Sequence, residues 1–474
     1  MSAPLILGTN SIKDTASYEV ANSCRFNGAI NNDETLIKTF GTATNRKKFT
    51  FSVWIKLSGR GQGNNNGLLV AGTTGNDEGT IKIANDNISW SEYDADTASV
   101  VGNLQSNKVL RDYSAWQHLV FRWDSTDSTA GDRMQIYHNG TRLTSFSATT
   151  NPSVNYEGAL NGAVLHNIGR QSWNNSGDFN GYMAEIFFID GTALNADSFG
   201  EFDSLSNIWK PKDCKDNFTF GNNGFYLEFK QSGTGTNSSG IGADTSGNNN
   251  HFAVNNLTSL SQSTDTCTNN FCTLNPLTKR SGGNGTLTEG NLQYEASGGD
   301  SSVFGTIGIP PGMKVYFEVK LISNTAQNSI GIHNLYDGGD GDFVKGGDEA
   351  GTYAYKVRGA ANDTQYFNNG SLGGTVVSNY SANTIIGVAV DNENGQIHYS
   401  ANGTFINSSD PTDNNPVALV TGFGGSNEQY LHFSLDTSGG TNPKNQFNFG
   451  SPPYSISSGN SDAEGFGNFE YAVP

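Results

Sequence analysis

Cysteine is scarce in this sequence. The 474 residues include four, Cys24, Cys214, Cys267 and Cys272. So low a density excludes a small fold held together by disulfides. Cys267 and Cys272 are near enough in sequence to close a small ring, but neither a CxxC motif nor a histidine cluster accompanies them, which argues against zinc. We therefore expect free thiols in a protein assembled in a reducing cytoplasm.

Positive charge and long apolar segments are missing as well. Lysine and arginine number 27 against 45 aspartates and glutamates, so the net charge is −18. Nucleic-acid binding needs clustered cations, and the short basic run 46–48 is isolated. No stretch approaches the ~20 apolar residues of a membrane helix. The start, MSAPLILGTNSIKDT, lacks the basic region and sustained apolar core of a signal peptide. We expect no nucleic-acid partner, no membrane insertion and no signal peptide.

Glycine and aromatic residues are plentiful instead. The chain has 59 glycines but 12 prolines, and 11% of its residues are aromatic although only 35% are hydrophobic. Evenly spaced aromatic and β-branched residues between polar turns are typical of thin β-sandwich cores with long loops. A disordered chain would lack such strands. The composition predicts an all-β protein.

The stretch 384–403, TIIGVAVDNENGQIHYSANG, predicts two strands and their turns. Its apolar run at 385–390 is mostly β-branched, as in a buried strand. Asn394-Gly395 is expected to close a tight type I′ hairpin, and Asn402-Gly403 to turn the chain again. With VYFEVKL at 315–321 and FNFG at 447–450, this order of motifs resembles the SPRY domain. The resemblance implies a β-sandwich that binds partners through edge loops and has no catalytic activity.

Residues 18–230 also have an all-β pattern. In the strand at 49–57, apolar and polar residues alternate, which predicts one buried face. The motifs FTFSVWIK, WQHLVF, IYHNG and FNGYMAEIFFIDGTAL, in this order, resemble the laminin G-like, concanavalin A-like lectin sandwich. Such domains bind carbohydrates or proteins through loops at the sandwich rim, some with calcium. GFYLEF at 224–229 is expected to add a closing strand.

The predicted organisation has four parts. Residues 1–17 form an N-terminal arm, whose Leu5, Ile6 and Leu7 either dock on a neighbouring surface or belong to a simple tether. A concanavalin A-like sandwich at 18–230 follows. A polar, Gly/Asn/Ser-rich stretch at 231–290 is read as a connector. The SPRY-like sandwich is expected at 291–474.

The whole chain resembles virion proteins of marine tailed bacteriophages, which combine these two modules with a TNNFCTLNP connector. This resemblance implies a structural protein of the virion, assembled in the host cytoplasm and exposed as a tail fibre, an appendage or a capsid decoration. We expect a homo-oligomer, with a trimer best suited to a fibre. Its partners would be other virion proteins and host-surface glycan or protein.

No enzyme is expected. Many concanavalin A-like glycosidases carry an ExDxxE strand whose alternate carboxylates share one cleft. Here Glu185 and Asp190 differ by an odd number of positions, so they face opposite sides of a regular strand, and Phe187 occupies the place of the second carboxylate. No GxSxG motif or phosphate-binding loop is present. A glycan hydrolase is the least favoured function.

Two acidic loops are candidate calcium sites. Asp337, Asp340 and Asp342 lie in one Gly-rich loop, and carboxylates are the ligands that calcium prefers. Asp124, Asp127 and Asp132 form a second group before the IYHNG hairpin. Because neither spacing is that of an EF-hand, solvated acidic loops are the preferred interpretation, and no cofactor is expected.

Glycan binding calls for an exposed aromatic ring beside amide or hydroxyl groups. Three segments, all expected in loops, offer this chemistry: Trp90 with Tyr93; Trp173, Asn174 and Asn175; and Tyr366, Phe367 and Asn368. The alternative is that these rings cover loops or fill contacts between subunits. The sequence thus predicts a non-enzymatic adhesin, with a purely architectural virion protein as the alternative.

Overall fold

The computed structural model describes most of the chain and divides it into two compact units, Asn10–Asn270 and Phe271–Pro474. The described residues are 18–28, 33–72, 77–170, 177–279, 284–297, 301–323, 327–334, 351–358, 364–376, 380–412, 420–423, 428–436 and 442–474. Within these ranges the elements are antiparallel strands and single 3-10 turns, with no α-helix. The predicted all-β fold with two antiparallel sandwiches is confirmed. No described helix is long and apolar enough to span a bilayer.

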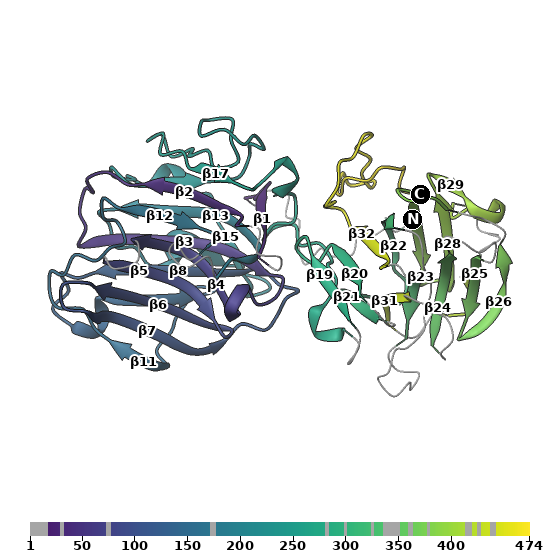
Figure 1. Cartoon of the computed structure of the whole chain (residues 1–474), viewed down its shortest axis with the longest axis horizontal. Helices are drawn as coiled ribbons and strands as arrows, with labels where there is room; N and C mark the ends of the chain where they lie inside the picture. Colours follow the sequence, from purple (N-terminus) through teal and green to yellow (C-terminus); the bar gives the residue numbers. More distant parts are fainter. Residues whose placement is uncertain are drawn as a thin grey trace. The chain divides into compact units, whose positions relative to one another are not determined.

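The first unit consists of two eight-stranded sheets packed face to face (Figure 1). Sheet A contains, in spatial order, β10 (Thr141–Arg142), β9 (Met134–His138), β8 (Gln117–Asp124), β3 (Lys48–Leu57), β13 (Asn180–Asp190), β1 (Ser23–Asn27) and β18 (Gln262–Ser263), with β16 (Phe225–Leu227) beside β13. Sheet B contains β11 (Phe146–Thr150), β7 (Ser99–Val109), β6 (Asn87–Asp94), β5 (Glu78–Ala84), β4 (Asn65–Gly72), β12 (Leu165–Ile168), β2 (Thr35–Thr39) and β17 (Ala253–Asn255). A separate hairpin is formed by β14 (Gly200–Phe202) and β15 (Trp209–Pro211), and the 3-10 turns of this unit are η1 (Gln62–Asn64), η2 (Ala130–Asp132), η3 (Ala196–Ser198), η4 (Lys215–Asn217) and η5 (Ser259–Ser261).

Alternating side chains build the core between the two sheets. Phe49 and Phe51 of β3 point inward with Phe121 of β8, and they meet Trp90 and Leu104 from sheet B. Each of these side chains is almost completely buried. The period-two pattern read from the sequence is therefore the pattern that fills this core.

Sheet A is buried on its outer face too, which the sequence did not predict. In β3, Thr50, Ser52, Trp54 and Lys56 are buried along with the core-facing residues. The expectation of one buried face was wrong because a second apolar layer, made from later parts of the chain, packs on this side of the sheet. The aromatic side chains of this second layer are Trp54, Trp116, Tyr137, Tyr182, Phe187, Phe199, Trp209, Phe220 and Tyr226, with Tyr18 and Phe218 at its margin.

The segment predicted as a connector largely belongs to the first unit. Strand β17 pairs with β2 and β18 pairs with β1, so residues after 250 complete both sheets. Phe252 is fully buried in the core and forms an edge-to-face contact with Phe225, 4.8 Å between ring centroids. The sequence pattern failed here because these strands are only two or three residues long, too short for a periodicity to be visible.

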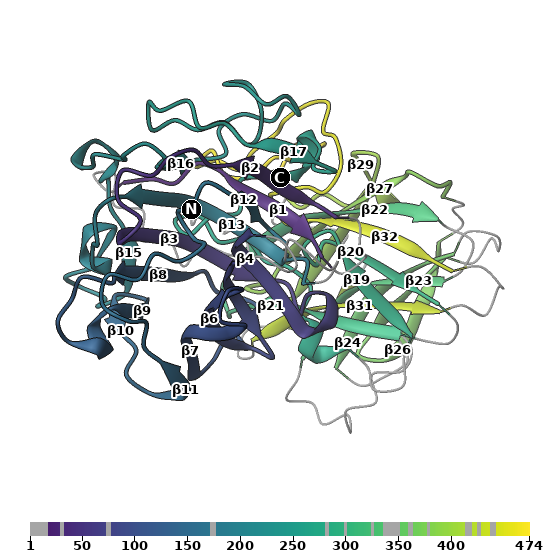
Figure 2. The same ribbon diagram turned by 60° about the vertical axis from the view of Figure 1, so that its left-hand side comes forward.

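The second unit is another pair of antiparallel sheets, drawn in green and yellow in Figure 2. Sheet C contains β19 (Gly285–Thr288), β20 (Gln293–Ala296), β32 (Lys444–Asn448), β22 (Lys314–Ser323), β27 (Ile385–Asp391), β28 (Gln396–Ala401) and β29 (Thr404–Phe405), with β30 (Val420–Thr421) beside β28. Sheet D contains β21 (Ser301–Ile309), β31 (Gln429–Asp436), β23 (Gln327–His333), β24 (Thr352–Arg358), β25 (Thr364–Asn368) and β26 (Ser371–Val376), and the 3-10 turns are η6 (Pro276–Thr278) and η7 (Ile406–Ser408).

Of the two turns predicted in the second unit, one has the expected length and the other is longer. Ala401 pairs with Thr404, so Asn402-Gly403 forms the expected two-residue turn. The turn at Asn394-Gly395 is longer than predicted, because Asp391 pairs with Gln396 and leaves four residues between them. The Asp391 carboxylate accepts the backbone N–H groups of Glu393 and Asn394, each at 2.9 Å, and this local bonding favours the wider loop.

All four cysteines are free thiols, as expected. Cys24, Cys214 and Cys272 are buried and Cys267 is half-buried. Burial raises the pKa of the Cys214 thiol to about 12 and that of the Cys24 thiol well above its ordinary value. These cysteines therefore pack as small apolar residues and are protected from reaction.

Candidate functional site

Trp90 is not in a loop, so its assignment to a binding surface was wrong. It lies in β6 and is 0% exposed. Its indole packs edge-to-face against Phe121, with 5.8 Å between ring centroids, and lies at the same distance from Trp123. The short NDN turn before β6 and the polar residues around Trp90 suggested a loop, but they alternate with core residues along an ordinary strand.

Tyr93 lies on the opposite side of the same strand, in a different environment. Glu92 points inward, where its carboxylate accepts the backbone N–H of Ala159 at 2.9 Å. Tyr93 therefore faces outward with Ser91 and is half-buried. Its cross-strand neighbours are Glu78 on β5 and Val100 on β7. Of the two residues predicted here, only Tyr93 belongs to an accessible surface.

Outward-facing polar residues from β5, β6 and β7 form one continuous surface. These three strands are neighbours in sheet B (Figure 1). Ser91 pairs with Thr80 on one side and with Asn103 on the other, and Ser89 pairs with Lys82 and Gln105. Directly paired residues share a face of the sheet, with neighbouring strands about 4.8 Å apart. We call Lys82, Ser91, Tyr93, Asn103 and Gln105 the polar patch.

The polar patch is accessible and its hydrogen-bonding groups are available. All five side chains are half-buried, whereas Val70, farther across the same face, is fully buried. Among the described residues, the side chains of Ser91, Asn103 and Gln105 make no hydrogen bond to another part of the chain. Hydroxyl and amide groups next to a tyrosine ring can bind the hydroxyls and the apolar face of a sugar, or the backbone of a peptide.

Lys82 gives this surface its only cation. Burial lowers the pKa of Lys82 from its ordinary value, and the nearby Glu78 carboxylate partly offsets that effect. Glu78 itself accepts a hydrogen bond from the Thr80 hydroxyl at 2.9 Å. The patch thus has a cation at Lys82 and, across from Tyr93, the Glu78 carboxylate whose charge acts on that cation.

The other predicted binding residues do not form a described loop site. Trp173, Asn174 and Asn175 lie outside the described residues. Tyr366, Phe367 and Asn368 lie in strand β25, so their placement in a loop was wrong. Phe367 is buried at 5% exposure, and the Asn368 side chain accepts the backbone N–H of Thr421 at 3.0 Å. Phe367 therefore offers no exposed ring, and Asn368 is already used within the fold.

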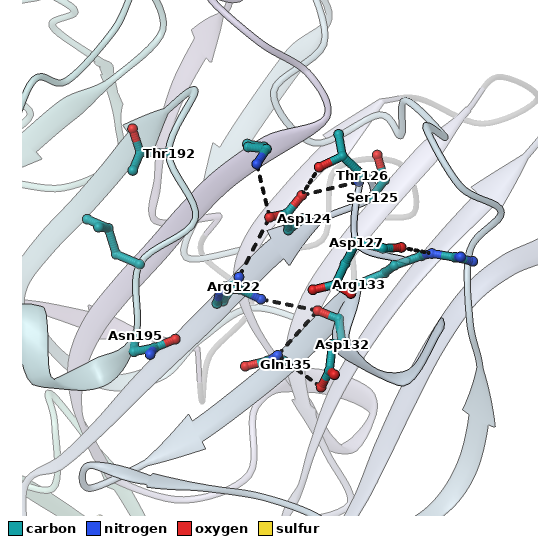
Figure 3. A network of polar contacts seen from close by, with 12 residues as sticks. Arg122, Asp124, Ser125, Thr126, Asp127, Asp132, Arg133, Gln135, Thr192 and Asn195 are labelled. Carbon is teal, nitrogen blue, oxygen red and sulfur yellow. Dashed lines mark hydrogen bonds and ion pairs between the residues drawn. The ribbon is translucent and has the colours of Figure 1, made fainter. Parts of the chain in front are cut away.

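The second predicted calcium group is a network of ion pairs. Figure 3 shows Asp124 joined to Arg122 and Thr126, Asp127 joined to Arg133, and Asp132 joined to Arg122 and Gln135. Asp124 pairs with Lys48 at 3.2 Å and with Arg122 at 3.6 Å. The Asp132 carboxylate pairs with Arg142 at 2.6 Å, and Asp127 accepts the backbone N–H of Thr129 at 2.8 Å. The carboxylates stabilise the loop that leads into β9 rather than converging on one point.

The first predicted calcium group cannot be placed, because Asp337, Asp340 and Asp342 lie outside the described residues. Among the described residues, no group of three or more histidine, cysteine, aspartate or glutamate side chains is arranged to hold a metal ion. A calcium site at the first group remains a prediction from its residue types.

Glu185 is a buried carboxyl enclosed by tyrosines. Its strand bulges between Ala184 and Phe187, and its φ of 50° is unusual for a residue other than glycine or asparagine. Tyr18 donates a hydrogen bond to this carboxyl at 2.9 Å, and Tyr226 donates a second. Burial raises the pKa of Glu185 to about 7, while the two tyrosine hydrogen bonds act in the opposite direction.

Asp190 is held by a separate set of donors at the end of the same strand. Its carboxylate accepts the backbone N–H groups of Thr44 at 2.6 Å and Asn223 at 3.1 Å, and the side-chain amide of Asn161 at 2.7 Å. The sequence argument treated this strand as regular, whereas the bulge at Glu185 interrupts it. The two carboxylates still have no shared partner among the described residues.

Sequence reasoning missed four of the five residues of the polar patch. Lys82, Ser91, Asn103 and Gln105 each lie one position from a core residue in a strand. The sequence did contain a signal for these residues. In three consecutive strands, polar residues alternate with apolar ones, and the polar residues lie on one face of the sheet when neighbouring strands pair. A criterion based on aromatic residues in loops does not detect polar residues in strands.

Residues 27–198 match the Laminin_G_3 family model, described as the concanavalin A-like lectin/glucanases superfamily. This segment includes the whole polar patch, and the match confirms the concanavalin A-like character predicted for the first sandwich. A search of curated proteins found no match.

Three solved structures show similarity at low sequence identity. The SPRY domain of human HERC1 is 14% identical with a TM-score of 0.28, covering 37% of this chain and 96% of that one. A SAP-like pentraxin from Limulus polyphemus is 15% identical with a TM-score of 0.28, covering 38% and 80%. The TRIM65 PSpry domain is 12% identical with a TM-score of 0.27, covering 37% and 88%. What the family match establishes is a lectin-like, concanavalin A-like first sandwich, and this sandwich carries the polar patch.

Proposed function

We propose that this chain is a non-enzymatic structural protein of a bacteriophage virion that binds host-surface glycan or protein through the polar patch. The observation that carries the binding role is the patch itself. It places unoccupied hydroxyl and amide groups beside Tyr93 on the open face of a lectin-like sandwich. The binding surface is thus on the sheet face, not in the rim loops favoured from the sequence.

The arrangement of the buried carboxyls supports a binding role over hydrolysis. A retaining glycosidase needs two carboxyl groups about 5 Å apart across an open cleft. Glu185 is enclosed by Tyr18 and Tyr226, and Asp190 is saturated by backbone and amide donors. A glycan hydrolase is therefore the least supported function, and incubation with polysaccharide should leave the viscosity of the polymer unchanged.

The virion location rests on the resemblance of the whole sequence to marine phage virion proteins. In a tail fibre or appendage, repeated copies would give avidity, so even millimolar single sites suffice for attachment. We propose a homotrimer for this arrangement. Antibody labelling of intact particles tests the location, since a fibre protein is labelled at the tail and a decoration protein over the capsid.

The alternative function, an architectural virion protein that binds other virion proteins, is favoured by one specific feature. The β14–β15 hairpin carries Phe202, Leu205 and Ile208, which are 47%, 93% and 56% exposed. The Asp203 carboxylate accepts the backbone N–H groups of Leu205 and Ser206, at 3.1 and 2.9 Å, and so fixes the turn. A rigid turn that presents apolar side chains to solvent suits protein contact better than sugar contact.

A glycan array with the intact oligomer tests the primary proposal. Ser91→Trp places a bulky ring in the middle of the polar patch without entering the core. Ser128→Trp is the matched control, because Ser128 is an exposed residue in the loop before β9. Binding of array glycans or host cells that Ser91→Trp abolishes and Ser128→Trp preserves supports adhesion through the patch. Blank arrays and no cell binding by the unmodified oligomer would remove that proposal.

A further inference from the structure

The polar patch has one charged member among neutral ones. Lys82 lies on β5 and faces outward between the core residues Ile81 and Ile83. Ser89 is its direct neighbour on β6, and Gln105 is the next residue across on β7. Ser89 is buried, so a ligand group bound at Lys82 would also reach the side-chain amide of the half-buried Gln105. This combination recognises an anionic group within an otherwise neutral, polyhydroxylated molecule.

Because the whole protein is acidic, the position of this single cation indicates where an anionic ligand could bind. With a net charge of −18, the protein repels polyanions at long range. An anionic ligand can then be held only where a local cation outweighs that repulsion. Lys82 is half-buried, and burial lowers the pKa of its ammonium group. A bound anion would restore part of the solvation that the ammonium has lost in the fold.

Glu78 limits where a second negative charge could lie. It pairs directly with Tyr93, and its carboxylate also raises the pKa of the Lys82 ammonium on the same strand. The five residues from Ser89 to Tyr93 along β6 span about 13 Å, enough for a short oligosaccharide. An anionic group beside Tyr93 would meet the Glu78 carboxylate, and like charges in contact are disfavoured. The surface thus suits a chain in which charged and neutral sugars alternate.

We propose that the polar patch binds an anionic saccharide, with a uronate carboxylate or sulfate ester at Lys82 and a neutral sugar ring against Tyr93. This proposal rests on the proposed binding function of the patch and adds the chemical class of its ligand. The carboxylate or sulfate accepts a charge-assisted hydrogen bond from the Lys82 ammonium. Asn103, Gln105 and Ser91 bind the hydroxyls between the two ends.

Matched saccharide pairs test the charge requirement. The first pair is a tetrasaccharide of alternating glucuronate and N-acetylglucosamine and its carboxyl-reduced form. The second is a monosulfated tetrasaccharide and its desulfated form. Titration calorimetry on the intact oligomer should give about tenfold tighter binding of a charged member than of its neutral partner, which is about 1.4 kcal/mol. The pair that shows the preference identifies the anionic group, and the preference should shrink as salt is added.

Two variants at one position separate charge from shape. Lys82→Gln should abolish the preference for the charged saccharide, and Lys82→Arg should retain it. If the preference survives in Lys82→Gln, the anion is bound elsewhere and this proposal is wrong. If both members of each pair bind equally and Ser91→Trp abolishes both, the patch is a glycan site without charge selectivity, so only this inference fails. If no saccharide, array glycan or host cell binds the unmodified oligomer, the proposed function fails with it.

Discussion

The first sandwich has two outer faces, and they differ in what lies on them. The outer face of sheet A is covered by the second layer, in which Phe187 stacks on Tyr226 with ring centroids 4.3 Å apart. On the outer face of sheet B, the side chains of Ser91, Asn103 and Gln105 are half-buried and make no hydrogen bond to another described residue. Strand alternation predicts a polar, accessible outer face. This prediction therefore holds for the part of sheet B that carries the polar patch, but not for sheet A, whose outer face is covered by the second layer.

Polar residues behave differently on these two faces. On sheet A, the Lys56 ammonium is 1% exposed and pairs with Asp265 at 2.7 Å, while Trp116 donates its indole N–H to the same carboxylate at 2.8 Å. On sheet B, Lys82 keeps its side chain at the surface. A polar group that is sealed and paired is structural, whereas one that is accessible and unpaired is free to bind a ligand. This difference is the reason for placing the site on sheet B.

The largest expected effect is the difference in stability loss between substitutions at Lys56 and at Lys82. Lys56→Met leaves the Asp265 charge buried without its cation and should lower the free energy of unfolding by about 3–5 kcal/mol. Lys82→Met, on the accessible face, should change it by less than about 0.5 kcal/mol. All six tryptophans lie before residue 271, so urea unfolding followed by tryptophan fluorescence reports on the first unit alone. Equal losses in both variants would contradict the distinction between the faces.

The second expected effect is the pH dependence that Glu185, a carboxyl on the sealed face, adds to the stability of the protein. Burial raises the pKa of Glu185 from 4.5 to about 7. The folded state therefore binds this proton more tightly, and stability from Glu185 is full below pH 4.5 and is lost as the pH rises to about 7. The total is about 3 kcal/mol. Glu185→Gln should remove this part of the pH profile, measured as the difference between two fluorescence unfolding series. Parallel profiles for the two proteins would show that Glu185 does not titrate in this window.

A smaller loss of stability is expected for a substitution at Gly140, in a turn that contacts Trp209 of the second layer. Gly140 has a φ of 78°, and a Cβ there would lie 2.3 Å from the Trp209 ring. Gly140→Ala should displace that ring, weaken the hydrogen bond from its N–H to His118, and cost about 1–3 kcal/mol. The tryptophan emission should also shift to longer wavelength. For comparison, Gly131→Ala meets nothing within 4 Å and should behave like the unmodified protein.

The smallest effect on stability is expected at the site itself. Tyr93→Ala should leave the unfolding midpoint almost unchanged, because the half-buried ring lies outside both apolar layers. Saccharide affinity should fall by about 1 kcal/mol, roughly fivefold, from the lost contact with the sugar ring. Calorimetry with the saccharide that the unmodified protein binds best measures this change. A stability loss as large as that of Lys56→Met would mean that Tyr93 is part of the fold and not of an accessible surface.

The sequence predicted the strands but not what packs on them. Alternation identified β3 and β8, and Asn402-Gly403 marked a turn correctly, because these signals are local. The second layer depends on contacts such as the one between Lys56 and Asp265, 209 positions apart, and no local pattern encodes it. The site was found in part. An aromatic residue alone does not reveal its orientation, so Tyr93 was identified together with the buried Trp90.

Because Lys56 and Asp265 are far apart in the sequence, they also leave the ribosome at different times during synthesis. Most of the first sandwich leaves the ribosome well before the carboxylate that neutralises Lys56 and the short strand β18 that pairs with β1. Until about residue 270 has emerged, the growing chain holds the Lys56 ammonium without the Asp265 carboxylate and the β1 edge without β18. A recombinant fragment that stops at residue 230 would be fixed in that unfinished state, so a fragment for separate expression has to extend to Asn270.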